Sequence, residues 1–208
     1  MNTKHSLFAH MESRLEQFKE SLTRSLAEPT GASASGALLA KKIVRKLGHV
    51  GGPLEECATG NPLRDCLHEA AKIAGALSGH PPTLATALLG IADALRWYKR
   101  PAVNEPVFEQ GHMNAEIFGP RGLVVRNDVM VGVTLMKPGL TYPDHHHPPE
   151  EIYVVLSEGL WRQNDAPWWS PGPGGYVYNP PDILHAMKSL QTPLFAVWSL
   201  DLDSPAGA

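Results

Sequence analysis

Side chains that can bind a metal ion are concentrated in the segment 139–153, which reads GLTYPDHHHPPEEIY. If this segment is extended, alternate side chains share one face, because consecutive side chains of a strand point to opposite faces. The odd-numbered side chains that would then face one cavity are His145, His147, Glu151 and Tyr153. The even-numbered His146 and Glu150 would point outward. The spacing therefore predicts a cluster of metal ligands on one face of a strand.

A second strand must supply a further ligand. His185 ends the stretch NPPDILH (179–185), which is rich in turn-forming residues, and we expect a neighbouring strand to carry it. Two imidazoles and a carboxylate that leave coordination positions open indicate a catalytic metal site rather than a closed structural one. Three consecutive histidines also occur in exposed loops without a function, but the in-register glutamate, the tyrosine and the distant histidine favour the metal site.

The same residues resemble the two cupin motifs, G(X)5HXH(X)3-4E(X)6G and G(X)5PXG(X)2H(X)3N. The first motif is matched by Gly139, His145, His147 and Glu151, with Gly159 one residue late. The second is matched by Gly174, Pro180 and His185, with Asp182 in place of glycine and Ser189 in place of asparagine. These departures concern the turns rather than the ligands. The resemblance implies a mainly β fold with N-terminal α-helices, in which the barrel is a cupin (double-stranded β-helix, or jelly-roll).

A narrower resemblance comes from Tyr142 and Tyr153 around the histidine run, together with a helical N-terminal region and a length of 208 residues. This layout is similar to the cupin dimethylsulfoniopropionate lyases of marine bacteria, the DddQ kind in particular. The family cleaves dimethylsulfoniopropionate into dimethyl sulfide and acrylate at a divalent metal. The resemblance implies that the metal ligands are His147, Glu151, Tyr153 and His185, that Tyr153 is also the catalytic base, and that Tyr142 and His145 lie beside the substrate.

The chemistry of this β-elimination suits such a site. The proton to be removed is alpha to a carboxylate, whose negative charge opposes a carbanion, and a metal bound to that carboxylate stabilises the enolate as a Lewis acid. A free tyrosine has a pKa of about 10, and a nearby dication favours its phenolate. The leaving dimethyl sulfide is neutral and needs no general acid. One base and one metal, whether zinc, iron, manganese, cobalt or nickel, are therefore sufficient.

The sulfonium cation of the substrate requires an aromatic wall. The candidate side chains are Tyr142, Trp161, Trp168, Trp169, Tyr176, Tyr178 and Trp198. Most of them are expected in the core or at the rim, while Trp198 lies in an alternating run (194–202) that can place it in the barrel. Its expected partners on that face are Leu194, Ala196, Leu200 and Leu202.

Composition favours one compact soluble domain, or such a domain with an appended helical part. The chain is 43% hydrophobic, has a formal net charge of -3, and has a pI of about 6.4. We therefore expect neither a nucleic acid nor a membrane as partner. The basic stretch 41–46 has helical spacing and is interpreted as a solvated helix face. No signal peptide or membrane span is visible, and Cys57 and Cys66 are expected to be reduced in a cytoplasmic protein, although one bridge between them stays open.

Two regions are expected along the chain. Residues 1–102 have helical spacing, and residues 103–208 have short β-rich segments separated by glycine and proline. The helices are predicted to end before Pro29 and to span about 37–47, 63–77 and 83–99, with Asn61 as N-cap of the third. The predicted strands are 107–108, 115–118, 123–126, 129–136, 152–156, 176–178 and 194–202. The helical region is expected to pack on the cupin barrel or in a dimer interface, and the protein is expected to be a monomer or a homodimer.

The sequence leaves several functional alternatives open. The first is the lyase. The second is another metal-dependent cupin enzyme, such as an oxygenase or isomerase acting on a small carboxylic acid, and the third is a ligand-binding cupin without catalysis. His145 is either a metal ligand or a substrate contact. The loop 166–175 is either a lid over the barrel or a plain connection.

Overall fold

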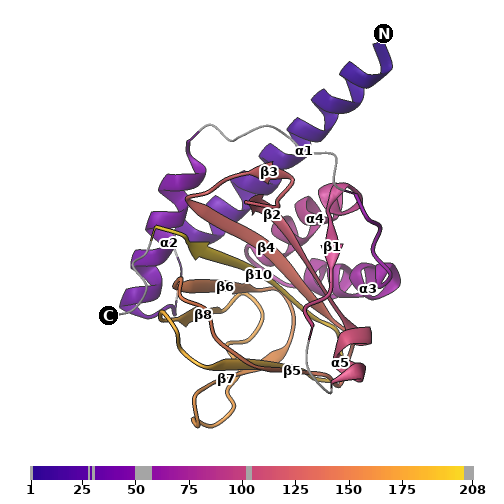
Figure 1. The fold of residues 1–208 in the computed structure, drawn as a ribbon. Helices are drawn as coiled ribbons and strands as arrows, with labels where there is room; N and C mark the ends of the chain where they lie inside the picture. The colour runs from indigo at the N-terminus through magenta and orange to yellow at the C-terminus, as the bar shows by residue number, and fades with distance from the viewer. Residues whose placement is uncertain (1, 28, 30, 50–57, 102–104, 204–208) are drawn as a thin grey trace.

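The computed structural model describes residues 2–27, 29, 31–49, 58–101 and 105–203, with side chains described from residue 10 onward. Four long helices precede most of the strands. The helices are α1 (Asn2–Ala27), α2 (Ala34–Leu47), α3 (Arg64–Gly75), α4 (Pro81–Ile91), the 3-10 helix η1 (Ala92–Ala94) and the short α5 (Pro106–Gly111). They lie on the outer side of a pair of sheets (Figure 1).

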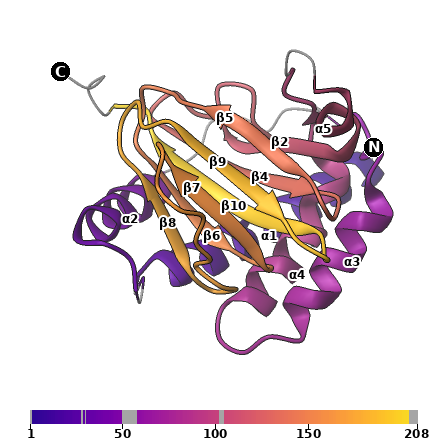
Figure 2. The ribbon, with the colours of Figure 1, turned by 90° about the horizontal axis from the view of Figure 1, so that it is seen from below.

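Two sheets, antiparallel apart from one parallel pair, form the β part. The strands are β1 (Trp97–Tyr98), β2 (His112–Gly119), β3 (Val124–Val125), β4 (Val129–Met136), β5 (Thr141–His145), β6 (Glu151–Val155), β7 (Gly159–Gln163), β8 (Tyr176–Asn179), β9 (His185–Ser189) and β10 (Leu194–Asp201). The larger sheet has the order β1-β2-β4-β10-β6-β8, with β3 parallel to β2, and the smaller sheet has the order β5-β9-β7. Figure 2 shows the smaller sheet in front of the larger one, with the helices beyond.

The central strands of the larger sheet are buried on both faces, and alternate side chains serve two different cores. On β10, Phe195 and Val197 belong to the core shared with the helices. The residues that alternate with them face the space between the sheets. The second core there contains Leu194, Ala196, Trp198 and Leu200, with Leu202 partly buried against it. The predicted inward orientation of Trp198 and its partners is therefore confirmed. Strand β6 alternates in the same way, with Tyr153 inward and Ile152 and Val154 toward the helices.

The first two helices follow the sequence prediction closely. The helix α1 ends at Ala27, before Pro29, and α2 begins after Ser33, whose hydroxyl accepts the N–H of Gly36 at 3.1 Å. On α1, Phe18 and Leu22 are fully buried, whereas the side chain of Phe8 lies outside the described residues.

The third and fourth helices differ from the prediction. Asn61 is not the N-cap of α3, because its side chain accepts the N–H of Leu63 at 2.8 Å in a turn before the helix begins. The fourth helix ends at Ile91, and the segment predicted to continue it to residue 99 contains β1. Pairing with β2, which places Trp97 opposite Ala115, overrides the local helical spacing.

Several strand predictions also need correction. Val107 and Phe108 lie in α5 rather than in a strand, because Pro106 occupies the first turn of a helix, where proline is favoured. Of the three strands of the smaller sheet, β7 was not predicted, whereas β5 and β9 were expected only as extended segments that carry the histidines. In β5, Pro143 and Asp144 have low strand propensity, so the alternation that marks β10 is absent there.

Three further expectations concern the division into regions, the cysteines and membrane-spanning helices. The strand β1 precedes residue 102 and joins the larger sheet, but the division into regions 1–102 and 103–208 stays a prediction. Cys66 is half-buried, and burial raises the pKa of its thiol to about 11, whereas Cys57 lies outside the described residues. Among the helices described, none is long and apolar enough to cross a membrane.

Candidate metal centre and cavity

The histidine run lies at a corner between the two sheets, not along one strand. His145 ends β5 in the smaller sheet, and Glu151 begins β6 in the larger sheet. The intervening Pro148 and Pro149 lack backbone N–H donors and cannot continue a ladder. The expectation that the odd-numbered residues share a single strand is therefore wrong, although the chain still brings them to one cavity.

The strand β9 delivers His185, as the sequence predicts. It pairs antiparallel with β5 and places His185 directly opposite His145, with ring centroids 4.1 Å apart. At the turn before β9, Asp182 adopts a positive φ of 56°, and its N–H donates to the carbonyl of His147 at 3.0 Å. The turn that precedes one histidine is thus hydrogen-bonded to the backbone of another.

Three side chains form a compact group of potential metal ligands. One ligand atom each from His147, Glu151 and His185 can be chosen so that all lie within 4.8 Å of one another. The Nε2 atoms of both histidines are 3.4 Å from Oε2 of Glu151. Asn179, in β8 opposite Glu151, donates to that same oxygen at 2.8 Å and orients the carboxylate.

The hydrogen bonds of the histidines prepare their Nε2 atoms to bind a metal. The Nδ1 atoms of His145, His147 and His185 lie 2.8, 2.8 and 2.9 Å from the carbonyls of Pro143, Pro149 and Ile183. Because a carbonyl only accepts, each neutral ring carries its proton on Nδ1 and a lone pair on Nε2. The Nε2 atom of the fully buried His185 has no hydrogen-bond partner. These donors fit a divalent metal.

The electrostatics of the cluster keep Glu151 ionised. Burial opposes its charge, but the contacts with His147 and His185 outweigh burial and hold the pKa of Glu151 far below its usual range. Burial lowers the pKa of His147, and the interaction with Glu151 overcomes this effect and raises it. The protein thus presents a buried anion between two imidazoles, an arrangement suited to a cation.

Two tyrosines stand beside this group. Tyr153 lies two residues after Glu151 on the inner face of β6 and is only 3% exposed. Its burial, followed by the negative charge of Glu151, raises its pKa well above the usual value, so the protein alone keeps it protonated. Tyr142, on β5, is also buried, and its hydroxyl accepts from Nδ2 of Asn114 at 3.4 Å.

A small cavity adjoins all of these side chains. Its volume is about 100 Å³, which suits a compact ligand rather than a drug-sized one. Six of the predicted site residues line it, namely Tyr142, His145, His147, Glu151, Tyr153 and Trp198, while His185 contacts the group through Glu151. The cavity is also lined by Leu200, which was expected on the inner face of β10, and by residues that the sequence analysis missed, which are Tyr98, Arg100, Asn114, Met130 and Thr134.

A glycine makes room for the aromatic wall of the cavity. Gly132, on β4, is paired with Trp198, on β10. A Cβ atom at Gly132 would lie only 2.2 Å from Cζ2 of that indole. The absence of a side chain at Gly132 therefore leaves the space that the indole occupies at the edge of the cavity.

The other aromatic candidates do not line the cavity. Trp161 is buried at 6.3 Å from the ring of Tyr153, and Trp169 bridges to its backbone. Tyr176 donates to the carbonyl of Ser25 and Tyr178 to Glu150, both toward the helices. Trp168 contacts the cations of Arg162 and Lys188. The loop 166–175 that carries two of these tryptophans stays a predicted lid or connection.

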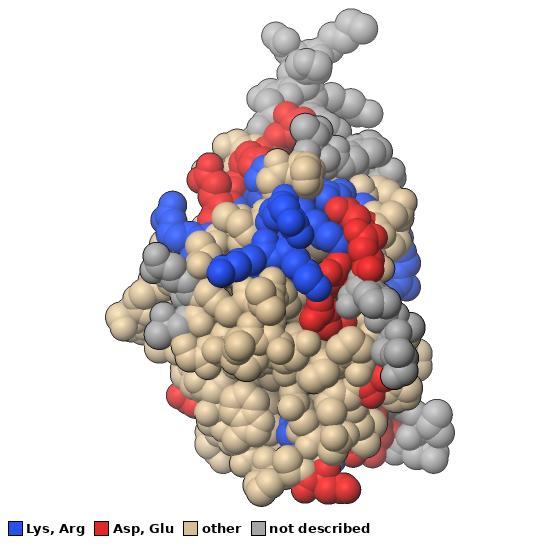
Figure 3. Space-filling model, turned by 90° about the vertical axis from the view of Figure 1, so that its left-hand side faces the viewer, with Lys and Arg blue, Asp and Glu red and all other residues tan. Residues whose placement is uncertain are grey.

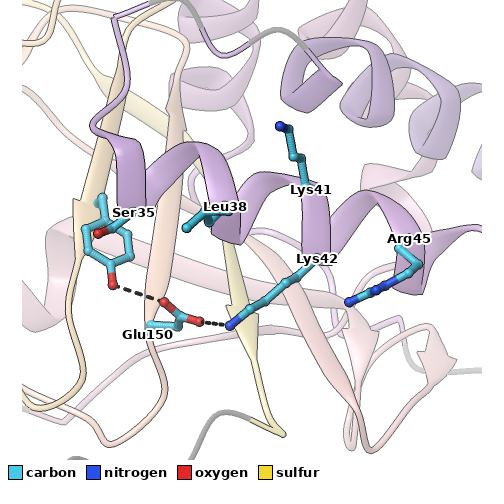
Figure 4. A pocket seen from close by; sticks show the side chains of 7 residues that line it. Ser35, Leu38, Lys41, Lys42, Arg45 and Glu150 are labelled. Atoms are coloured by element: carbon cyan, nitrogen blue, oxygen red, sulfur yellow. Dashed lines mark hydrogen bonds and ion pairs between the residues drawn. The ribbon is translucent and has the colours of Figure 1, made fainter.

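A larger cavity of about 560 Å³ lies on the face that carries α2, where Lys and Arg side chains gather (Figure 3). Figure 4 shows Lys42 reaching Glu150, while Lys41 points away. Lys41 and Arg45 are exposed, in keeping with the predicted solvated helix face, but Lys42 and Lys46 bind the carboxylate of Asp201. This cavity contains none of the potential metal ligands described above.

Comparisons with known proteins agree with this site. The model of the dimethylsulfoniopropionate lyase family matches residues 39–196. DddQ of Ruegeria pomeroyi, a dimethylsulfoniopropionate lyase, is 33% identical over 91 residues, which are 42% of this chain and 45% of that protein. DddL of Cereibacter sphaeroides, named as a candidate lyase, is 31% identical over 116 residues, which are 55% of this chain and 47% of that protein. The matches therefore span about half the length of these curated relatives.

Solved structures resemble nearly the whole chain. A structure described with the lyases RdDddP and RnDddQII has a TM-score of 0.68 at 23% identity and covers 92% of this chain and 93% of its own. The structure of DddQ from Ruegeria pomeroyi has a TM-score of 0.60 at 20% identity and covers 91% and 99%. The expected fold class, a cupin barrel of antiparallel strands with N-terminal helices, is confirmed.

Proposed function

The chain belongs to the dimethylsulfoniopropionate lyase family, and from this premise we propose that it cleaves dimethylsulfoniopropionate into dimethyl sulfide and acrylate. One observation carries the proposal. A group of potential metal ligands and a buried tyrosine, Tyr153, adjoin the same small cavity. A metal-binding cupin without elimination chemistry has no need of that tyrosine.

In the proposed site, His147, Glu151 and His185 hold one divalent transition metal, and Tyr153 is the fourth ligand. When bound, such an ion supplies Lewis acidity to the substrate carboxylate and positive charge that favours the phenolate. Asn179 keeps Glu151 in place through its hydrogen bond at 2.8 Å. We propose zinc, iron or manganese, with cobalt and nickel as further candidates, since mixed nitrogen and oxygen ligands accept all five.

The elimination itself then needs one side chain. The Oη atom of Tyr153 removes the proton alpha to the carboxylate, and a double bond forms between the alpha and beta carbons. The beta carbon–sulfur bond breaks, and its electron pair leaves with sulfur as neutral dimethyl sulfide. Tyr142 and His145 border the substrate, and Trp198 offers its indole face to the sulfonium. The product that remains is acrylate.

The test is direct assay of both products. We would load the purified protein with zinc, iron, manganese, cobalt or nickel, add dimethylsulfoniopropionate, and measure headspace dimethyl sulfide and dissolved acrylate. One dimethyl sulfide per acrylate, with near-complete loss in Tyr153→Phe, is expected. Tyr176→Phe is the matched control, because that hydroxyl donates to Ser25 on the helix side. No release with any of the five metals would overturn the proposal.

A further inference from the structure

Arg100 is the one lysine or arginine among the residues that line the small cavity. It lies two residues after the end of β1 and is only partly exposed. The other lining side chains with a charge or a strong hydrogen-bonding group are the acid Glu151, two histidines, three tyrosines, an asparagine and a threonine. The cavity therefore has one fixed positive charge from the protein itself.

The backbone of Arg100 is fixed by a short chain of contacts. Its N–H donates to Nε2 of His112 at 2.9 Å. The Nδ1 atom of that fully buried ring lies 2.6 Å from the carbonyl of Phe108, so the proton is on Nδ1 and Nε2 accepts. The ring also stacks on Phe108 with centroids 3.7 Å apart. Arg100 thus extends from an anchored position rather than from a free loop.

The charge of Arg100 reaches the groups around the cavity. Burial raises the pKa of Tyr142, and both the charge of Arg100 and a hydrogen bond with it oppose that rise. Tyr142 and His145, both of which were expected beside the substrate, line the cavity together with Arg100.

Other arginines of the barrel pair with an acid. Arg121, Arg126 and Arg162 bind Glu116, Asp128 and Asp144, respectively. Within the part of the chain that the structure describes, Arg100 forms no ion pair with a carboxylate of the protein. A guanidinium beside a ligand cavity is suited to bind a carboxylate with two parallel hydrogen bonds.

We propose that Arg100 binds the carboxylate of the substrate, an inference that rests on the proposed function. The same charge repels a sulfonium group, which we place away from Arg100, against the indole face of Trp198. Arg100 thereby determines the orientation in which the zwitterionic substrate binds. The ligand class it selects is a short carboxylate, with or without a cationic group on the beta carbon.

The test measures binding of two half-ligands by calorimetry to the metal-loaded protein. Acrylate has the carboxylate but no sulfonium, and trimethylsulfonium has the cation but no carboxylate. We expect Arg100→Gln to weaken acrylate binding roughly tenfold or more, because a hydrogen-bonded charge is lost. Trimethylsulfonium binding should be unchanged or tighter. Arg100→Lys should lie between wild type and Arg100→Gln for acrylate, since it keeps the charge but not the fork.

Controls separate this role from a general effect. Arg96→Gln removes an exposed cation that does not line the cavity and should bind acrylate as the wild type does. Metal content and melting temperature of each variant must match the wild type. Unchanged acrylate binding in Arg100→Gln, or equal weakening of both half-ligands, would overturn the inference. Because binding is measured without turnover, a wild type that binds acrylate but releases no dimethyl sulfide would refute the proposed function alone.

Discussion

The Nε2 atoms of His147 and His185 lie at the same distance, 3.4 Å, from one oxygen of Glu151. One histidine comes from the corner between the sheets and the other from β9, so the two approach the carboxylate from different parts of the barrel. Both histidines and the carboxylate between them are therefore expected to contribute to metal affinity.

Replacing His185 with glutamine should lower metal affinity by more than the roughly 10- to 100-fold typical of losing an outer hydrogen-bond partner. The reason is that Nε2 of His185 has no hydrogen-bond partner in the protein and is free to donate its lone pair to a metal. Metal content after dialysis against a chelator measures the effect. The matched control is His146→Gln, because that exposed ring lies outside the ligand group. Equal metal retention in both variants would contradict the assignment.

Gly132→Ala should destabilise the protein by roughly 1–3 kcal/mol through overpacking. A Cβ atom there would lie 2.2 Å from Cζ2 of Trp198 and 2.3 Å from the carbonyl oxygen of Ala115. The displaced indole should also weaken substrate binding. Urea unfolding and KM are the measurements. Gly75→Ala in α3, where an added Cβ meets nothing within 4 Å, is the control and should be neutral or stabilising. A similar effect of both substitutions would refute this reading.

The turn before β9 should accept glycine and reject a β-branched residue. Asp182 has a φ of 56°, where glycine is at ease and valine is strained. Asp182→Gly should therefore change stability by less than about 1 kcal/mol, and Asp182→Val should destabilise by roughly 1–2 kcal/mol or more. Chemical unfolding checks both, and metal content should be retained in the glycine variant. A valine variant as stable as wild type would show that this φ is not required.

The ion pairs between α2 and β10 should make stability depend on pH at the acidic end. Burial raises the pKa of Asp201, but the hydrogen bond and charge of Lys46 outweigh it and lower the pKa below its ordinary 3.8. The resulting stabilisation is present above about pH 3.8, the ordinary pKa of this carboxyl. It is lost as the pH falls through the lower pKa that Asp201 has in the folded protein. Asp201→Asn should thus be less stable than wild type near neutral pH, by roughly 1–3 kcal/mol.

The difference between Asp201→Asn and wild type should shrink as the pH falls below about 3.8, first because the carboxyl of the unfolded chain takes up a proton and then because that of the folded protein does. Urea unfolding across the acidic range measures this convergence. Glu158→Gln, at a carboxylate for which no ion pair is found in the described structure, serves as the comparison. A destabilisation of Asp201→Asn that stays constant down to about pH 2.5 would argue against the ion pair.

The parts of the fold that alternation marks were predictable from the sequence. The inward faces of β6 and β10 follow from residues two apart, which is why Tyr153 and Trp198 were placed in the barrel. The strand that carries His185 was expected because the stretch before it is rich in turn-forming residues. At the departure from glycine in the second motif, Asp182 takes the backbone conformation that glycine favours.

Other parts depend on contacts that no local pattern contains. Trp97 and Tyr98 have helical spacing with the residues before them, and only their pairing with β2 makes them a strand. Arg100 follows that strand, so its place at the cavity was equally hidden. Asn114 and Thr134 lie opposite each other on β2 and β4, where a hydrogen bond of 2.6 Å joins them beside Tyr142. Thr134 was the one polar side chain of an otherwise apolar strand, whereas β2 carries the polar His112 and Glu116 two residues to either side of Asn114.

Glu150 and Glu151 are neighbours in the chain but serve opposite sides of the sheet. Glu151 belongs to the metal group, whereas Glu150 is bound by Lys42 of α2 at 2.7 Å and by Tyr178 at 3.0 Å. A minimal enzyme made by deleting the helices would leave Glu150 without its lysine, 108 residues upstream, one position from a metal ligand. Truncation would therefore disturb the active site from the side of the sheet that faces the helices. A barrel engineered to stand alone would need a new cation on that outer face.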